Sequence, residues 1–188
     1  MTTHVPTREE AWELLCEYNT KPSLIHHALA VEAVMRHLAR QRSEDEDRWG
    51  IIGLVHDLDY ERFPDEHCGE TQRILEERGW PEDYVRAVLS HGWGEYTDVE
   101  PLEEVEKALY AVDELTGLVA ACALVRPSRS VMDLEVESVM KKFHDKRFAP
   151  GVNRQTILKG AEMLGVTVES LVHDTIEAMR EVSHEIGL

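Results

Sequence analysis

A histidine and an aspartate stand side by side at the end of an apolar stretch, in the segment GLVHDLDYERF (residues 53–63). Such a doublet is either the polar end of a helix or half of a metal site. Imidazole and carboxylate groups together form the mixed N/O ligand set that iron, manganese, zinc, cobalt and nickel accept. His56 and Asp57 alone favour a helix end, so a metal site requires further ligands elsewhere in the chain.

Four more residues have the type and the setting of metal ligands. His27 opens an amphipathic stretch one step from its apolar stripe, and His91 ends the stretch PEDYVRAVLSH. Asp113 lies within a long apolar run, where an unpaired carboxylate would be costly to bury. His67 lies in the polar segment PDEHCGE, at the expected start of a helix. The candidate ligands are therefore His27, His56, Asp57, His67, His91 and Asp113.

The neighbours of two candidates have simpler interpretations. His26 directly precedes His27 and points to a different face of the same predicted helix. Cys68 follows His67, and we interpret it as a small apolar residue and not as a thiolate ligand.

The elements that must position these residues are helices, because apolar residues recur every three or four positions and strand patterns are nearly absent. Thr7 and Ser43, each with a glutamate three residues later, match capping boxes. The sequence predicts an all-α fold, with a compact helical domain over 1–145 and a small helical extension over 146–188 packed on it. The expected helices span residues 7–19, 23–42, 44–57, 67–79, 81–91, 102–125, 129–144, 153–165 and 168–186.

Composition limits the classes of function. The chain has 188 residues, of which 43% are hydrophobic and 30% charged, as in a globular protein with a substantial core. A formal charge of −17 argues against binding to a nucleic-acid polymer or an anionic membrane. No signal peptide opens the chain, and three cysteines without a CxxC pair fit a reducing cytoplasm. The longest apolar run, Leu115 to Val125, has about half the length of a membrane span.

The order His27 … His56-Asp57 … His67 … His91 … Asp113 resembles the HD-domain superfamily of metal-dependent phosphohydrolases, over roughly residues 20 to 125. The segments HDLDY and DELTGL are most similar to small HDIG-type HD-domain hydrolases. The chain differs from the family pattern after the doublet, where Leu58-Asp59 replaces Ile-Gly and Tyr60 replaces a frequent lysine. It also lacks the GYP signature of cyclic dinucleotide phosphodiesterases.

The resemblance implies divalent metal ions, two where His67 and His91 add their ligands, and hydrolysis of a phosphoester or phosphoanhydride. Metal ions lower the pKa of bound water and polarise phosphoryl oxygens. In that scheme Asp57 bridges two ions and the other five candidates complete the ligand sets. Asp59 and Glu114, each next to or near a ligand, are expected to orient imidazoles or to assist proton transfer. Solvated charges at helix ends are the alternative role for these two.

A phosphorylated substrate calls for cations, and positive charge is concentrated in residues 126–154. This segment contains seven Lys or Arg residues against four Asp or Glu residues. We expect some of them to line the entrance and bind phosphate, with Arg126, Arg129, Lys141 and Lys142 as the named candidates. A basic helix face that pairs with acidic surface elsewhere is the competing interpretation.

The expected partner is a small phosphorylated substrate of nucleotide or metabolite type. The sequence does not decide between a monomer and a homodimer. Two other functions remain compatible with the ligand set. Folds of this type with six His and Asp ligands also hold two irons and activate oxygen, and a non-catalytic regulatory module could retain a structural metal.

Overall fold

The computed structural model describes residues 4–188, and in this range the chain is all-α. Its only strand-like pairing there is an isolated bridge between Trp93 and Thr97. The α-helices are α1 (Arg8–Tyr18), α2 (Pro22–Arg42), α3 (Glu46–Leu54), α4 (Gly69–Glu77), α5 (Glu82–Leu89), α6 (Glu104–Leu124), α7 (Val136–His144), α8 (Arg154–Leu164) and α9 (Val168–Glu181). Two 3₁₀ turns, η1 (Pro64–Glu66) and η2 (Ser90–Gly92), precede α4 and follow α5.

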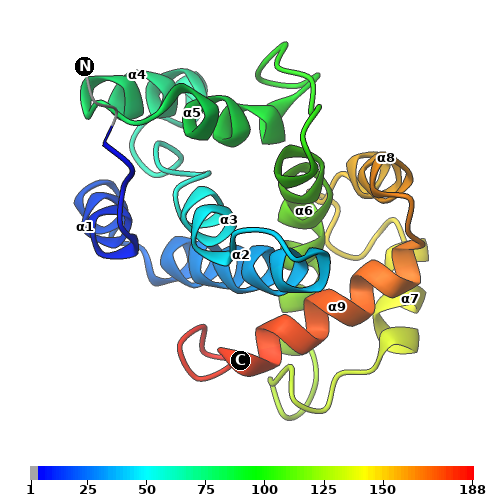
Figure 1. Ribbon diagram of the computed structural model, residues 1–188. Helices are drawn as coiled ribbons and strands as arrows, with labels where there is room; N and C mark the ends of the chain where they lie inside the picture. Colours follow the sequence, from blue (N-terminus) through cyan, green and yellow to red (C-terminus); the bar gives the residue numbers. More distant parts are fainter. Residues whose placement is uncertain (1–3) are drawn as a thin grey trace.

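The two longest helices, α2 and α6, form the centre of the fold (Figure 1). The helix α3 packs along α2, and α6 contacts α2, α8, α9 and η2. Apolar residues cover most faces of α6, including Leu109, Val112, Leu115 and Leu118, and all four are fully buried. A helix that is apolar nearly all round belongs in the core, surrounded by other helices. Any polar side chain on α6 is thereby carried into the interior.

The predicted helix positions are confirmed, with corrections at several ends. Thr7 forms the expected capping box with Glu10. Ser43 does not cap a helix start: it takes a left-handed conformation that ends α2, and Asp45 caps α3 instead. The helix expected over 129–144 begins only at Val136, because the Asp133 carboxylate accepts hydrogen bonds from Arg126 and Ser128 and holds the preceding residues in turns.

The helix expected over 44–57 ends at Leu54, before the His-Asp doublet. The Nδ1–H of His56 donates a 2.7 Å hydrogen bond to the carbonyl oxygen of Gly53. In a continuing α-helix that carbonyl would accept from the backbone N–H of Asp57. The imidazole therefore takes the place of a backbone donor, and both members of the doublet lie in the turn that follows α3.

The C-terminal helices pack directly on the centre of the fold: α8 lies against α6, and α9 contacts both α2 and α6. The division that we expect at residue 145 falls between α7 and α8. None of the helices within residues 4–188 is both long enough and apolar enough to cross a membrane.

Arg154, the first residue of α8, organises the connection from α7 to α8. Its guanidinium group donates hydrogen bonds to six backbone carbonyls, those of Lys142, Phe143, Asp145, Phe148, Ala149 and Val152. One half-buried side chain thus satisfies four carbonyls of the loop and two carbonyls at the end of α7.

The contact between α6 and α8 depends on a missing side chain. A β-carbon on Gly160 would lie 2.5 Å from the Cα atom of Ala111. Because that neighbour is backbone, the helices would have to separate. We expect Gly160→Ala to lower the free energy of unfolding by about 1–3 kcal/mol, measured by urea denaturation.

Gly117 provides the matched control, since a β-carbon there meets nothing within 4 Å. Gly117→Ala should raise the free energy of unfolding by roughly 0.5–1 kcal/mol, because alanine is the better helix former. A Gly160→Ala protein that unfolds at the same urea concentration as the wild type would contradict the close packing.

Candidate metal centre

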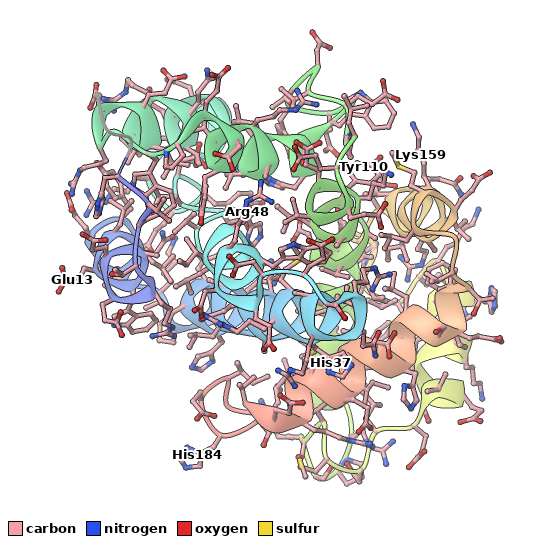
Figure 2. All side chains as sticks on the ribbon, viewed as in Figure 1. Glu13, His37, Arg48, Tyr110, Lys159 and His184 are labelled. Carbon is pink, nitrogen blue, oxygen red and sulfur yellow. The ribbon has the colours of Figure 1, made fainter. Side chains whose placement is uncertain are left out.

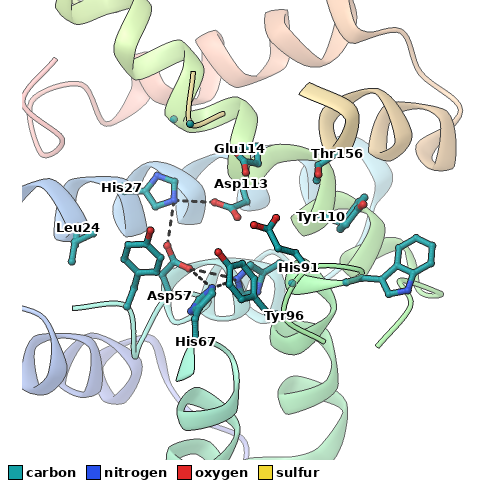
Figure 3. Close-up of a pocket in the computed structure, with 16 residues that line it drawn as sticks. Leu24, His27, Asp57, His67, His91, Tyr96, Tyr110, Asp113, Glu114 and Thr156 are labelled. Carbon is teal, nitrogen blue, oxygen red and sulfur yellow. Dashed lines mark hydrogen bonds and ion pairs between the residues drawn. The ribbon is translucent and has the colours of Figure 1, made fainter. Parts of the chain in front are cut away.

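The structure brings the six predicted ligand residues together in two adjoining groups, and Figure 3 shows five of them, His27, Asp57, His67, His91 and Asp113. They arrive on separate elements: His27 from α2, the doublet from the turn after α3, His67 from the end of η1, His91 from η2, and Asp113 from the middle of α6.

Four of these residues form a first group around His27. Its Nε2 atom lies 3.0 Å from Asp113 Oδ1 and 3.8 Å from Asp57 Oδ2. The Nε2 atom of His56 lies 3.3 Å from Asp113 Oδ1 and 3.4 Å from Asp57 Oδ2. Ligands bonded at roughly 2.1 Å to one ion are about 3.0–3.4 Å apart. The spacing of the four atoms therefore suits a single ion.

A second group faces the other oxygen of Asp57. The Nε2 atoms of His67 and His91 are each 3.5 Å from Asp57 Oδ1 and 3.2 Å from one another. Cys68 lies beside them, with its sulfur 3.9 Å from His91 Nε2. The two oxygens of Asp57 thus face different groups of ligand atoms, which is the geometry of a carboxylate that can bridge two ions.

Hydrogen bonds on the far side of each ring aim the Nε2 atoms at the centre. His56, His67 and His91 use their Nδ1 atoms for bonds to the Gly53 carbonyl, the Asp59 carboxylate and the Val88 carbonyl, at 2.7, 2.7 and 2.6 Å. These bonds leave each Nε2 lone pair free to coordinate a metal.

The Nε2 atom of His56 provides a direct test of whether a metal fits. It is buried and has no hydrogen-bond partner. Native proteins rarely leave a buried polar atom unsatisfied, and coordination of a metal ion is one way to satisfy it. A divalent ion between His27, His56, Asp57 and Asp113 would satisfy this atom, so the residues fit such a group.

The pKa values of the site show the same match between carboxylates and imidazoles. Burial lowers the pKa of His56, but the Asp57 and Asp113 carboxylates outweigh burial and raise that pKa to about 10. Burial likewise opposes ionisation of Asp113, but His56 and His27 hold its pKa well below the usual range. At neutral pH a metal must therefore displace protons, so its apparent affinity falls as the pH is lowered.

Asp59 and Glu114, the two further polar candidates, occupy different positions. Asp59 is fully buried, and its oxygens accept from His67 Nδ1–H at 2.7 Å and from the Thr71 backbone N–H at 2.9 Å. Asp59 thus contacts a ligand ring from behind. Glu114 lines the pocket and accepts from the Asn153 backbone N–H at 3.1 Å. Burial, with the neighbouring Asp113, raises the pKa of Glu114 to about 7.

The basic residues expected at the entrance are not brought to the site. Arg126, Arg129, Lys141 and Lys142 are absent from the lining of the pocket. Arg126 pairs with Asp133 at 3.0 Å, and the ammonium group of Lys142 lies 4.6 Å from the Phe148 ring centroid. The reason is the length of α6 beyond Asp113. The helix continues for eleven residues to Leu124, which is roughly 16 Å at 1.5 Å per residue, so the basic segment begins far from the site.

The pocket itself is a cavity of about 340 Å³ that opens over the metal ligands. Sequence reasoning missed most of its wall, which consists largely of aromatic rings and of carboxylates beyond the ligand set. The only available signal was the cluster HGWGEY around His91. The missed lining residues include Tyr60, Trp93, Glu95, Tyr96, Tyr110, Gly151 and Thr156.

A family model described as HD domain matches residues 24–118, and the chain belongs to this family. The match contains all six candidate ligands, and it extends from the first turn of α2 to the middle part of α6. Searches among curated proteins and among solved structures gave no match. The HD domain family consists in general of metal-dependent hydrolases, and the His and Asp groups of this chain could hold a metal.

Asp59 provides a test of how the second group is held. An asparagine has the same shape but only one side-chain oxygen. It therefore cannot accept hydrogen bonds from both the His67 Nδ1–H and the Thr71 N–H in the way that the two oxygens of Asp59 do. We expect Asp59→Asn to weaken binding of Mn²⁺ or Co²⁺ at the His67–His91 pair by roughly 10- to 100-fold, measured by calorimetric titration. Asp65→Asn, an exposed change in η1, is the control. Equal affinities in the two variants would exclude a positioning role for Asp59.

Proposed function

We propose that this protein is a metal-dependent phosphohydrolase that acts on a small phosphorylated compound and uses two divalent ions. The observation that carries the proposal is the position of Asp57, whose two oxygens face separate groups of ligand atoms. Dinuclear sites in which a carboxylate lies between the ions are suited to displacement at phosphorus.

In this proposal the ions lower the pKa of water and stabilise charge on the phosphoryl oxygens. The side chains of the protein have the remaining tasks. Asp57 holds both halves of the site in register, and Asp59 fixes the ring of His67. The oxygen of a water molecule bonds to phosphorus and the water gives up a proton to solvent, while the ester P–O bond breaks and the leaving alcohol takes up a proton. Glu114, a pocket carboxyl next to Asp113, is placed to deliver that proton.

Asp57→Asn tests this function. The substitution removes the charge that faces both groups of imidazoles, so at least one ion should be lost. Because water activation depends on the ions, phosphate release from a generic phosphomonoester should fall by several orders of magnitude. Metal analysis of the purified protein and a phosphate-release assay check the two effects. Full hydrolytic activity in a correctly folded variant would refute the mechanism, and turnover that requires oxygen would indicate an oxygenase instead.

Adjacent histidines offer a matched pair for the first group. His27→Asn should lower metal content and reduce hydrolysis by at least 100-fold, because His27 Nε2 is one of the four clustered atoms. His26→Asn alters the preceding residue, and the ring of His26 lies beside Gly187 in the C-terminal segment. Metal content and rate should stay near wild type in that variant. Similar losses in both variants would show that α2 as a whole, and not His27, is responsible.

A further inference from the structure

The pocket above the ligands is lined by acidic and aromatic side chains. Beyond the candidate metal ligands its acidic lining residues are Glu95 and Glu114, and no Lys or Arg belongs to the lining that the structure describes. Four aromatic rings complete the wall, those of Tyr60, Trp93, Tyr96 and Tyr110. A second anionic group on the substrate would therefore face carboxylates, whereas a cationic group would find favourable partners.

Each of the four aromatic rings contacts another ring of the site. The Tyr96 ring centroid lies 4.7 Å from that of His67, and the Tyr60 centroid lies 5.2 Å from it, both with edge-to-face geometry. Trp93 and Tyr110 contact each other at 5.8 Å. Figure 3 shows Tyr96 and Tyr110 beside the cluster of ligands. The faces of such rings attract ammonium groups.

The protein already uses this wall to bind one of its own cations. The ammonium nitrogen of Lys159 on α8 lies 3.5 Å from the Trp93 ring centroid. Lys159 lines an adjoining hollow that shares Trp93, Glu95 and Tyr110 with the pocket (Figure 2 shows Lys159 and Tyr110). Glu95, by contrast, forms no ion pair within residues 4–188. Its carboxylate is thus available to a ligand.

We infer that the substrate is the phosphate monoester of a small amino alcohol, with its phosphoryl group at the metal centre and its ammonium group between Glu95 and the tyrosine rings. This inference rests on the proposed function for its phosphate end. The ammonium end is recognised by a charge-assisted hydrogen bond to the Glu95 carboxylate and by cation–π contact. A cavity of about 340 Å³ suits a compound of this size.

The test compares ligands that differ only in the charged end. The metal-loaded protein is titrated by calorimetry with 3-aminopropylphosphonate and with 3-hydroxypropylphosphonate, whose C–P bonds resist hydrolysis. Phosphate release is measured separately with phosphoethanolamine and with 2-hydroxyethyl phosphate. We expect the amine of each pair to be favoured at least tenfold, in affinity and in kcat/KM, because one charge-assisted contact is worth about that factor.

Glu95→Gln should bring both ratios close to one, because the amide retains the shape but loses the charge. Glu100→Gln removes an equal charge from the same exposed loop outside the pocket and should preserve the preference. Preserved preference in Glu95→Gln would overturn the assignment of Glu95.

The outcomes separate the two proposals. Equal affinity for the two phosphonates, or no binding of either, overturns the inference about the amine. Hydrolysis of both esters at equal rates would do the same and would leave the phosphohydrolase proposal intact. Selective binding of the aminophosphonate without hydrolysis of either ester would support recognition of the ammonium group, but it would overturn both the phosphate monoester as the substrate and phosphoester hydrolysis as the function.

Discussion

A single carboxylate connects the separate segments of the metal centre. The two oxygens of Asp57 face imidazoles from α2, from the turn after α3, from the end of η1 and from η2. Removing such a group from water is costly unless positive charge compensates it. Protons on the imidazoles or bound cations supply that charge. The packing of α2, α3 and α6 sets the distances between the Asp57 carboxylate and the positive groups that balance its charge. The hydrophobic core and the site therefore depend on each other.

Several arginines of this acidic protein form ion pairs with nearby carboxylates and do not contribute charge to the pocket. Arg8 and Arg36 share the carboxylate of the buried Glu32, and Arg126 and Arg147 pair with nearby aspartates in the segment that is richest in basic residues. Short-range pairing of this kind reduces the electrostatic field that a count of residues suggests, and salt screens the remaining surface charges. The charge at the pocket is therefore set by its ligands and its own carboxylates.

The sequence predicts those features that depend on local periodicity. Helical spacing identifies α2 and α6 and places His27 and Asp113 toward the interior, so the candidate ligands could be chosen before the structure was known. The end of α3 could not be predicted, because an imidazole competes with the backbone for the Gly53 carbonyl. The pocket wall could not be predicted either, because Tyr60 and Glu95 lie in loops whose conformation depends on tertiary contacts. The number of basic residues in 126–154 likewise does not show how far α6 carries them from Asp113.

The guanidinium group of Arg154 gives the connection between α7 and α8 an unusual property. In most loops each carbonyl is satisfied independently, and the segment frays toward solvent in small steps. Here six carbonyls share one side chain. Those of Lys142, Asp145 and Ala149 also accept from a backbone N–H, so a rotation of Arg154 would take the shared donor from the other three at once. The segment includes Gly151, which forms part of the pocket wall. Loss of the Arg154 guanidinium group would therefore affect several carbonyls of this part of the wall at once, and not a single hydrogen bond.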